Sequence, residues 1–333
     1  MHLHWDWRLA RVVDAEGLII DESVWDGVRS SGLVANRIEM VRRKRMTPEA
    51  RDLFERFPEV DFSSINPEIL PPFTSEEMTL LDQASIILAR RGLEESAGDV
   101  DRRMEHLVHA VEEMRISWTT MESRVVEWVG LFLTGIDLDE QRRNIVNEAA
   151  SSSSFEDFIQ RLETDSPKHS PTGEEWVSIQ GVSSSAVEMS GRIKDAELAI
   201  RAHAESHVPS LSALLGPLLA ARMTVAAHGR ARLSRLPSST VQVLGAEKAF
   251  FAHLRTGSPP PKHGMIFQHP WISRSPRWVR GKISRLVAGK ASIAVRVDEY
   301  GGKVWGDEEI AAIERAVQAV RSRHPKPPSK RRR

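Results

Sequence analysis

Apolar residues alternate at intervals of three and four along two long stretches in the middle of the chain. The first stretch carries Val100, Met104, Leu107, Val111, Met114, Trp118, Met121, Val125, Trp128 and Phe132. The second carries Ile179, Val182, Ala186, Met189, Ile193, Ala196, Ile200, His203 and His207. An apolar position every 3.5 residues on average forms the seam of a coiled coil. Two such seams on one chain predict a long antiparallel pair of helices.

The first seam has two interpretations that its spacing does not separate. Packing inside one helical hairpin accounts for it, but methionine and tryptophan make the seam wide enough for a further helix. We therefore also predict a homodimer in which a second copy pairs along the coil, through Val111, Met114, Trp118, Met121 and Val125. Between the seams, residues 134–177 are rich in serine and proline, which predicts short helices and a flexible tip of the coil.

The segments before the coil have a mixed pattern. Residues 5–9 alternate apolar and polar side chains as a half-buried strand does, and residues 14–17 predict a turn. Thr47 and Pro48 predict the first residues of a helix. Prolines at positions 67, 71 and 72 predict a boundary. Residues 1–75 are therefore expected to form a small α+β domain.

Helical patterns dominate after the coil. Residues 208–236 are small and apolar, residues 279–297 place basic side chains opposite an apolar face, and residues 307–322 form a last amphipathic helix. The fold class predicted is mainly α. It has a small N-terminal α+β domain (1–75), a long antiparallel coiled coil (76–206), a C-terminal all-α domain (207–305), and a final helix with a basic, disordered tail (306–333).

Charge is distributed unevenly along a chain whose net charge is zero. From Arg222 to Lys290 there are 13 lysines and arginines but one acidic residue, Glu247. Such asymmetry within one chain points to a nucleic-acid-binding face.

Several other classes of protein are disfavoured by composition. The absence of cysteine excludes disulfides and thiolate metal sites. No apolar run approaches the roughly 18 residues of a membrane helix, and the start lacks signal-peptide features, so we expect a soluble, cytoplasmic protein that binds no membrane. His203 and His207 have a spacing that a metal could use, but no third ligand lies nearby, so coil packing is the better interpretation. Phosphate-loop, zinc-protease and nucleophile-elbow motifs are missing, which predicts no enzyme activity and no cofactor.

Four consecutive segments between residues 211 and 302 resemble the Nop domain. They are LSALLGPLLAARM (211–223), LPSSTVQVLGAEKAFFAHLRTG (236–257), PPKHGMIFQHP (260–270) and RSPRWVRGKISRLVAGKASIAVRVDEYGG (274–302). The overall layout is similar to that of the archaeal scaffold proteins of box C/D ribonucleoproteins. The resemblance is weaker before residue 200 and weakest before residue 75.

This resemblance implies a scaffold rather than an enzyme. Nop proteins bind a kink-turn in a box C/D guide RNA together with the ribosomal-type protein already seated on that kink-turn. In the archaeal complex the N-terminal domain holds fibrillarin, a 2′-O-methyltransferase that modifies rRNA and tRNA, and the coiled coil forms the homodimer. The methyl donor would belong to fibrillarin.

The candidate RNA-binding residues fall in three groups. Gly245, Ala246, Glu247 and Lys248 lie at a helix start, where small residues admit a phosphate to the free amides of the first turn. A tight helix–helix contact would need the same small residues. Lys262, His263, Gln268 and His269 combine charge with planar side chains that can stack on a base or bind its edge; for His269 a buried capping role is the alternative.

The third group is a basic cluster with one aromatic residue. Arg277 and Arg280, like Lys282 and Arg285, are three apart and are expected to share a helical face that follows adjacent phosphates. Arg274 belongs to the same cluster, and Trp278 is expected to be a packing anchor. Two alternatives remain open: a Nop-domain RNA-binding module without fibrillarin, as in splicing-type relatives, and an enzyme with an unrecognised site in the N-terminal domain.

Overall fold

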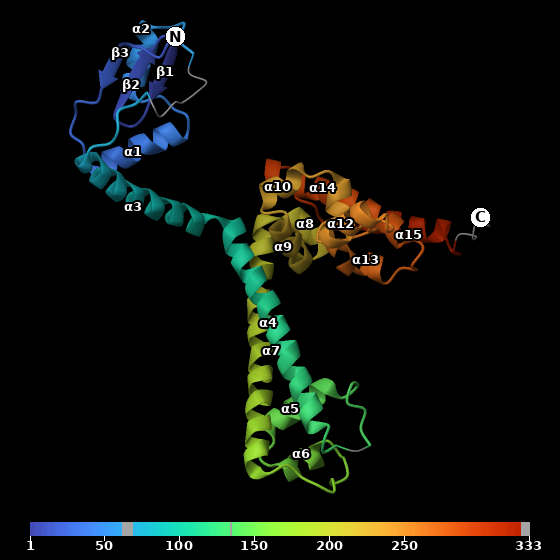
Figure 1. Ribbon diagram of the computed structural model, residues 1–333. Coiled ribbons are helices and arrows are strands. Elements are labelled where there is room, and N and C mark those ends of the chain that lie inside the picture. The colour runs from blue at the N-terminus through green and yellow to red at the C-terminus, as the bar shows by residue number, and fades with distance from the viewer. Residues whose placement is uncertain (62–68, 134, 328–333) are drawn as a thin grey trace. The chain divides into compact units, whose positions relative to one another are not determined.

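The computed structural model describes residues 1–61, 69–133 and 135–327, which form two compact units, Met1–Gly98 and Asp99–Arg333 (Figure 1). The boundary predicted at Pro67 and most of the predicted basic tail, from residue 328 on, lie outside the described residues. The first unit extends beyond residue 75 because a further helix packs against it. The two units are described separately below.

Three short antiparallel strands form the sheet of the first unit, in the order β1 (His2–Trp5), β2 (Leu9–Val13) and β3 (Ile19–Val24). The alternation at residues 5–9 is not one strand, so that prediction was wrong. Asp6 ends the strand early, because its carboxylate accepts the amide N–H groups of Arg8 and Leu9 and closes a turn between β1 and β2. The turn predicted at residues 14–17 is confirmed, with Gly17 at φ 87°.

Helices cover this sheet and extend from it: α1 (Ser31–Arg42), α2 (Pro48–Arg56) and α3 (Ser75–Gly98). Thr47 caps α2 through its hydroxyl, as predicted. Leu53 of α2 is fully buried against Leu3 of β1 in the main core of the unit. Trp7 packs with α1 and α3 in a second cluster, which is why α3 belongs to this unit.

Strand β3 is an edge of the sheet, and it leaves apolar side chains uncovered within the described part of this unit. Leu18, Ile19, Ile20 and Val24 are 44–69% exposed. Exposed apolar edges are rare in isolated proteins, since they invite pairing with another chain. The edge is therefore a candidate docking surface.

The predicted antiparallel coil is confirmed. Helices α4 (Val100–Val129) and α7 (Gly173–His207) lie side by side along their length (Figure 1). Asp101 near the start of α4 contacts His207 at the end of α7, so the two helices run in opposite directions. Several seam positions are fully covered, as at Met104 and Ile179, both 0% exposed, whereas Trp118 is only partly buried.

The segment between the coiled-coil helices is more ordered than a loop-rich tip. It holds α5 (Arg142–Ser151) and α6 (Phe155–Arg161), which confirms the predicted short helices. Phe158 is fully buried, and its ring centroid lies 5.2 Å from that of Trp176 at the start of α7. Ile145 and Val146 of α5 are buried in the same cluster, so one core holds both helices against the end of the coil.

The remaining helices form one all-α body around α14. They are α8 (Pro209–Leu215), α9 (Pro217–Ala226), α10 (Arg230–Arg235), α11 (Ser238–Val243), α12 (Glu247–Thr256), the 3₁₀ helix η1 (Met265–Gln268), α13 (Pro270–Ser273), α14 (Arg280–Tyr300) and α15 (Asp307–Arg323). The predicted helices at 279–297 and 307–322 are thus confirmed. Ile283 and Val287 are fully buried in α14, and α8, α10, α11 and α15 pack around it.

Helices α8 and α9 meet at a sharp corner. Their axes differ by 117°, and Gly216 at the corner has φ 80°, a conformation that favours glycine. Within the described residues no single helix is long and apolar enough to cross a membrane; only this bent pair, taken together, reaches the required length and composition.

Polar contacts tie the foot of the coil, meaning the first turn of α4 and the last turn of α7, to the C-terminal body. Asp101 accepts a hydrogen bond from the Arg230 amide at 3.0 Å and contacts His207 Nε2 at 2.8 Å. The Arg230 guanidinium donates to the His207 carbonyl at 2.9 Å and to Glu299 at 2.8 Å. Burial acts to raise the pKa of Asp101, but the hydrogen bonds with His207 and with the Arg230 amide outweigh it, so the pKa is lowered. Helices α4, α7, α10 and α14 are therefore cross-linked at one point.

Candidate nucleic-acid interface

Cations gather around the first turn of α14. The α14 cation cluster consists of Lys262, Arg277, Arg280, Lys282 and Arg285. The Lys262 side chain passes within 3.6 Å of the position that a Cβ on Gly281 would take, so it lies against the first turn of the helix. Lys282 and Arg285 are exposed on α14 and three residues apart. The predicted pairing of these two on one helical face is confirmed.

The cations of the cluster differ in whether they are free. Among the described residues, the guanidinium groups of Arg277 and Arg285 make no hydrogen bond or ion pair, and the same holds for the guanidinium of Arg274 at the end of α13. Arg280 instead donates to the carbonyls of Ser273 and Ser275, at 3.0 and 2.9 Å. Free, exposed guanidinium groups can bind phosphate without breaking a contact within the protein.

The prediction that Arg277 and Arg280 share a helical face was wrong. Helix α14 begins at Arg280, and Arg277 lies in the preceding turn, where the Val279 amide bonds the Pro276 carbonyl. Since the Arg280 guanidinium closes the chain between α13 and α14, its main contribution is to the shape of the surface. Trp278 was predicted to be a packing anchor, but it is 38% exposed and lies outside the hydrophobic core. Its indole N–H donates to the His324 carbonyl at 2.9 Å instead.

A planar stack stands beside the cluster. The ring of His263 lies over that of Phe267, with centroids 4.5 Å apart and an angle of 18° between the planes. The Arg280 guanidinium lies 5.3 Å from the centroid of the same phenyl ring. Burial, together with the positive charges of Arg280 and Lys262, lowers the pKa of His263, so its ring is neutral near pH 7. A neutral, half-exposed ring can extend the stack to a nucleic acid base.

Two glycines join this stack to the start of α12. The Gly264 amide donates to the Gln242 carbonyl and the Met265 amide to the Leu244 carbonyl, both at 2.8 Å. A Cβ on Gly264 would collide with the Leu244 carbonyl oxygen, and one on Gly245, at φ 81°, would collide with the Met265 side chain. The contact at Gly245 is therefore tight, but it joins a turn to Met265 and is not the helix–helix contact considered as the alternative. It holds the 242–245 and 262–265 segments together.

Helix α12 exposes two kinds of group. Its first-turn amides at Glu247, Lys248 and Ala249 have no acceptor among the described residues, while the Glu247 carboxylate accepts the Gly245 amide at 2.7 Å. The helix buries none of its residues. Phe250, Phe251 and Leu254 are 42–63% exposed. Sequence reasoning missed these three apolar residues, although their spacing along one helix was visible.

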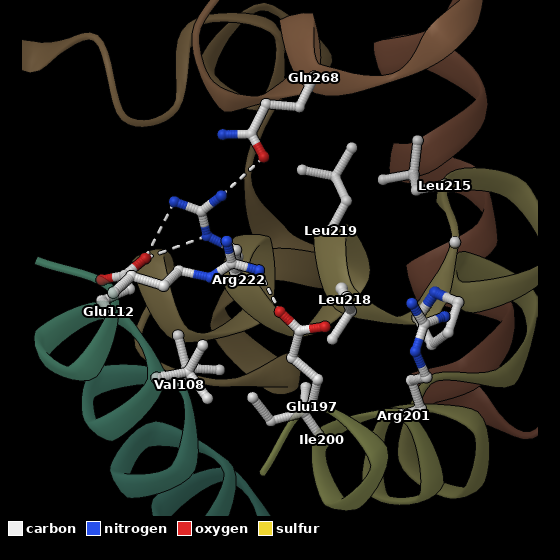
Figure 2. A pocket seen from close by; sticks show the side chains of 14 residues that line it. Val108, Glu112, Glu197, Ile200, Arg201, Leu215, Leu218, Leu219, Arg222 and Gln268 are labelled. Carbon is white, nitrogen blue, oxygen red and sulfur yellow. Dashed lines mark hydrogen bonds and ion pairs between the residues drawn. The ribbon is translucent and has the colours of Figure 1, made fainter. Parts of the chain in front are cut away.

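Gln268 and His269 have different environments. Gln268 is exposed and accepts a hydrogen bond from Arg222 at 2.6 Å (Figure 2). His269 is 7% exposed and caps α13: its Nδ1 accepts the Trp271 amide, and its Nε2 donates to the Leu214 carbonyl, both at 3.1 Å. Both ring nitrogens are occupied inside the fold. The capping alternative fits this geometry, and base stacking by His269 does not.

Stability should depend on the protonation of His269. Burial lowers its pKa below the ordinary 6.5, so the unfolded chain takes up a proton that the folded chain excludes. Above pH 6.5 His269 is neutral in both states, and the free energy of unfolding has its full value. Below that pH the free energy of unfolding decreases, by at most about 1.4 kcal/mol per pH unit for one proton. Urea unfolding at a series of pH values between neutral and acidic measures this slope.

The matched variant is His269→Asn, which keeps a capping oxygen but cannot be protonated. Its slope should be shallower than that of the wild type without vanishing, because burial also lowers the pKa values of His4 and His263. Equal slopes for the two proteins would show that His269 does not titrate in this way.

Metal ligands are not brought together. In the described part of the chain no three histidine, aspartate or glutamate residues are placed to hold a metal ion. His207 contacts Asp101, and His203 lies half-buried on the coil.

The fold and this surface together define an all-α protein with an exposed cation cluster. Comparison with known proteins identifies the family. Residues 111–319 match the Nop family, described as a snoRNA-binding domain, fibrillarin. This match covers more than half of the chain, so the chain belongs to the Nop family.

Individual relatives resemble a shorter part. A NOP5 family protein of Methanocaldococcus jannaschii is 49% identical over 119 residues, which are 36% of this chain and 28% of that protein. Nucleolar protein 56 of Homo sapiens is 40% identical over 141 residues, 41% of this chain and 24% of that protein. The chain thus matches about a quarter of the length of these relatives. A solved fibrillarin/Nop5p complex is 21% identical with a TM-score of 0.42, covering 90% of this chain and 97% of that one.

Proposed function

We propose that this protein is the non-catalytic scaffold of a box C/D guide RNA–protein complex. In this role the C-terminal body binds kink-turn RNA together with the kink-turn-binding ribosomal-type protein, and the N-terminal unit recruits fibrillarin, which methylates rRNA or tRNA. Membership of the Nop family supports the RNA-binding part. The methyl donor is bound by fibrillarin, and this chain needs no cofactor.

One observation carries the proposal: the free cations near α14 and the exposed apolar side chains of α12 lie on segments that are hydrogen-bonded to each other. Gln242 donates to the Lys262 carbonyl at 2.6 Å, which couples the segment before α12 to the α14 cation cluster. Phosphates suit the cations, and a protein surface suits Phe250, Phe251 and Leu254 of α12. A composite ligand of RNA and protein satisfies both, whereas RNA alone leaves the apolar face uncovered.

A gel shift tests this composite recognition. The full chain should shift kink-turn RNA only when the kink-turn-binding protein is present, because each component covers part of the surface. Equal affinity for the naked RNA would contradict the proposal. Phe251→Ser should weaken the ternary complex by about tenfold, as expected for losing one exposed aromatic anchor, without changing binding to naked RNA. Val187→Ser, an exposed apolar residue of α7, is the matched control.

Fibrillarin recruitment is assigned to the edge strand β3. Its apolar side chains Ile19, Ile20 and Val24, and that of Leu18 just before it, are uncovered in the described part of the N-terminal unit. An uncovered edge favours docking of another protein. The second candidate function, a Nop-domain RNA binder without fibrillarin, is favoured by a different observation: the family match begins at residue 111 and omits the whole N-terminal unit.

A pull-down with immobilised fibrillarin separates the two functions. For a scaffold, the full chain should be retained, and Ile20→Glu should reduce retention by about tenfold or more, since a buried unpaired charge costs several kcal/mol. Val28→Glu, which alters a residue 83% exposed outside the strands, should have no effect. Failure of the wild type to bind would favour the second function.

Two finer expectations belong to the same proposal. A homodimer through the coil is expected along the first seam, and light scattering of the full chain measures its mass. For location, the eukaryotic relatives carry the name nucleolar protein, while we expect this chain to act in the cytoplasm.

A further inference from the structure

A pocket of about 400 Å³ lies between the coil and the C-terminal body, where α4, α7 and the α8–α9 corner meet (Figure 2). Its floor is aliphatic. Four buried residues, each at most 7% exposed, line the floor: Val108, Ile200, Leu215 and Leu219. Leu218 also lines the pocket and is only partly buried. Pockets of about 300–1,000 Å³ with an apolar floor and a few polar groups are typical of small-ligand sites.

Charged side chains surround the mouth of the pocket. On one side Arg222 holds Glu112 at 3.0 Å and Gln268 at 2.6 Å. Arg115 is paired with Glu197. Both carboxylates therefore have an arginine partner. The guanidinium of Arg201, which Figure 2 shows on the other side of the view from Arg222, makes no hydrogen bond or ion pair with any described residue. The lining thus carries one uncompensated positive charge.

Two hydrogen-bonding atoms beside Arg222 are also unused among the described residues. Arg222 contacts Oε1 of Gln268 and Oε1 of Glu112, which leaves the Gln268 Nε2 donor and the Glu112 Oε2 acceptor. Each of the four RNA bases presents at least one acceptor and one donor on its pairing edge. A donor and an acceptor at the rim of an aliphatic pocket therefore match a base edge.

We propose that this pocket binds one unpaired nucleotide. The base packs on the aliphatic floor, its pairing edge faces Gln268 and Glu112, and its phosphate binds Arg201. This inference rests on the proposed RNA-binding function. Gln268 directly follows Phe267, on which His263 and Arg280 stack, so η1 joins the pocket to the interface. An apolar peptide side chain fits the floor less well, because it would cover the free donor and acceptor without bonding them.

The same chemistry has two sources, a nucleotide of the bound RNA and a free mononucleotide. The full chain is therefore tested with 5′-AMP alone, by calorimetry, and with guide RNA carrying 4-thiouridine at unpaired positions, in the complex with the kink-turn-binding protein. Photo-crosslinks are located by mass spectrometry. We expect a crosslink within residues 215–222 or at Gln268.

Two variants and one control complete the design. Arg201→Ala should weaken RNA binding about tenfold, the effect of losing one charge-assisted hydrogen bond. Leu218→Trp should remove the crosslink by filling the pocket. Arg192→Ala alters an arginine of the same helix whose ion pair with Glu188 is exposed, and it should behave as the wild type. Thermal unfolding confirms that each variant folds.

The outcomes separate this inference from the proposed function. If the complex assembles but the pocket neither crosslinks nor responds to Arg201→Ala, the inference is overturned and the scaffold stands. If no complex assembles, the scaffold proposal fails, and the pocket is then decided by AMP: binding lost in Arg201→Ala supports a free-nucleotide site, and no binding overturns it. A crosslink that persists at full yield in Leu218→Trp would place the nucleotide outside the pocket and overturn the inference.

Discussion

Reversing the charge of Arg277 and Arg285 together should weaken the complex with kink-turn RNA and its bound protein by about 100-fold. Neither guanidinium has a partner among the described residues, so Arg277→Glu and Arg285→Glu should leave the fold intact and act on the ligand alone. Two lost charge-assisted contacts amount to about 3 kcal/mol, or roughly a factor of 100. The slope of log affinity against log salt should fall by about 2.

The matched control uses two cations at the other end of α14. Arg232 and Arg235 of α10 are exposed and lack partners in the described structure, and α10 packs near the C-terminal half of α14, where Arg296 bonds the Ser234 carbonyl. Reversing both should change affinity far less. If the two double variants lose affinity equally, general charge attraction explains the binding and the α14 cation cluster is not the site.

The second large effect is expected for Gly264→Ala. A Cβ there would overlap the backbone carbonyl of Leu244, which cannot move without breaking the Met265–Leu244 hydrogen bond. We expect the free energy of unfolding to fall by about 3 kcal/mol or more, at the upper end for overpacking, and RNA binding to fall with it. Denaturant unfolding measures the loss.

Gly289→Ala controls for the substitution itself. Gly289 lies inside α14 with open space where a Cβ would stand, so alanine should stabilise the helix by about 0.5–1 kcal/mol. A Gly264→Ala protein as stable as the wild type would show that the 242–245 and 262–265 segments are not held in contact in solution.

Apolar patterns that extend over many turns of helix could be predicted from the sequence, whereas short strands, turns and weakly amphipathic helices could not. Two seams from Val100 to His207 identified the coil, because only helix packing produces so many intervals of three and four. The pattern at residues 5–9 gave a wrong prediction. A turn closed by Asp6 between two strands has the same alternation of apolar and polar residues as a single strand. The prediction placed residues 76–98 in the coil, whereas α3 packs against α1 of the first unit. This helix buries only Ala84 fully, too little for a clear apolar face.

Within the site, residue types predicted which side chains could bind RNA, but not which of them are free of internal hydrogen bonds. Arg277 and Arg280 look equivalent in the sequence, yet only Arg280 meets two backbone carbonyls and is used internally. His269 likewise donates a hydrogen bond from Nε2 to the carbonyl of Leu214, a residue 55 positions away in the sequence. Which donors are free depends on tertiary contacts of this kind, and spacing along the chain carries no information about them.

The cross-links among Asp101, His207, Arg230 and Glu299 have a mechanical consequence. Helix α7 has 35 residues, about 52 Å of length at 1.5 Å per residue, so it is a long lever arm. Each degree of bending at its base would displace the far end by about 1 Å. The hydrogen bonds among these four side chains hold the base of the arm and limit an angular motion that the arm would otherwise magnify. A position fixed on the C-terminal body is therefore transmitted along the coil to its distal helices.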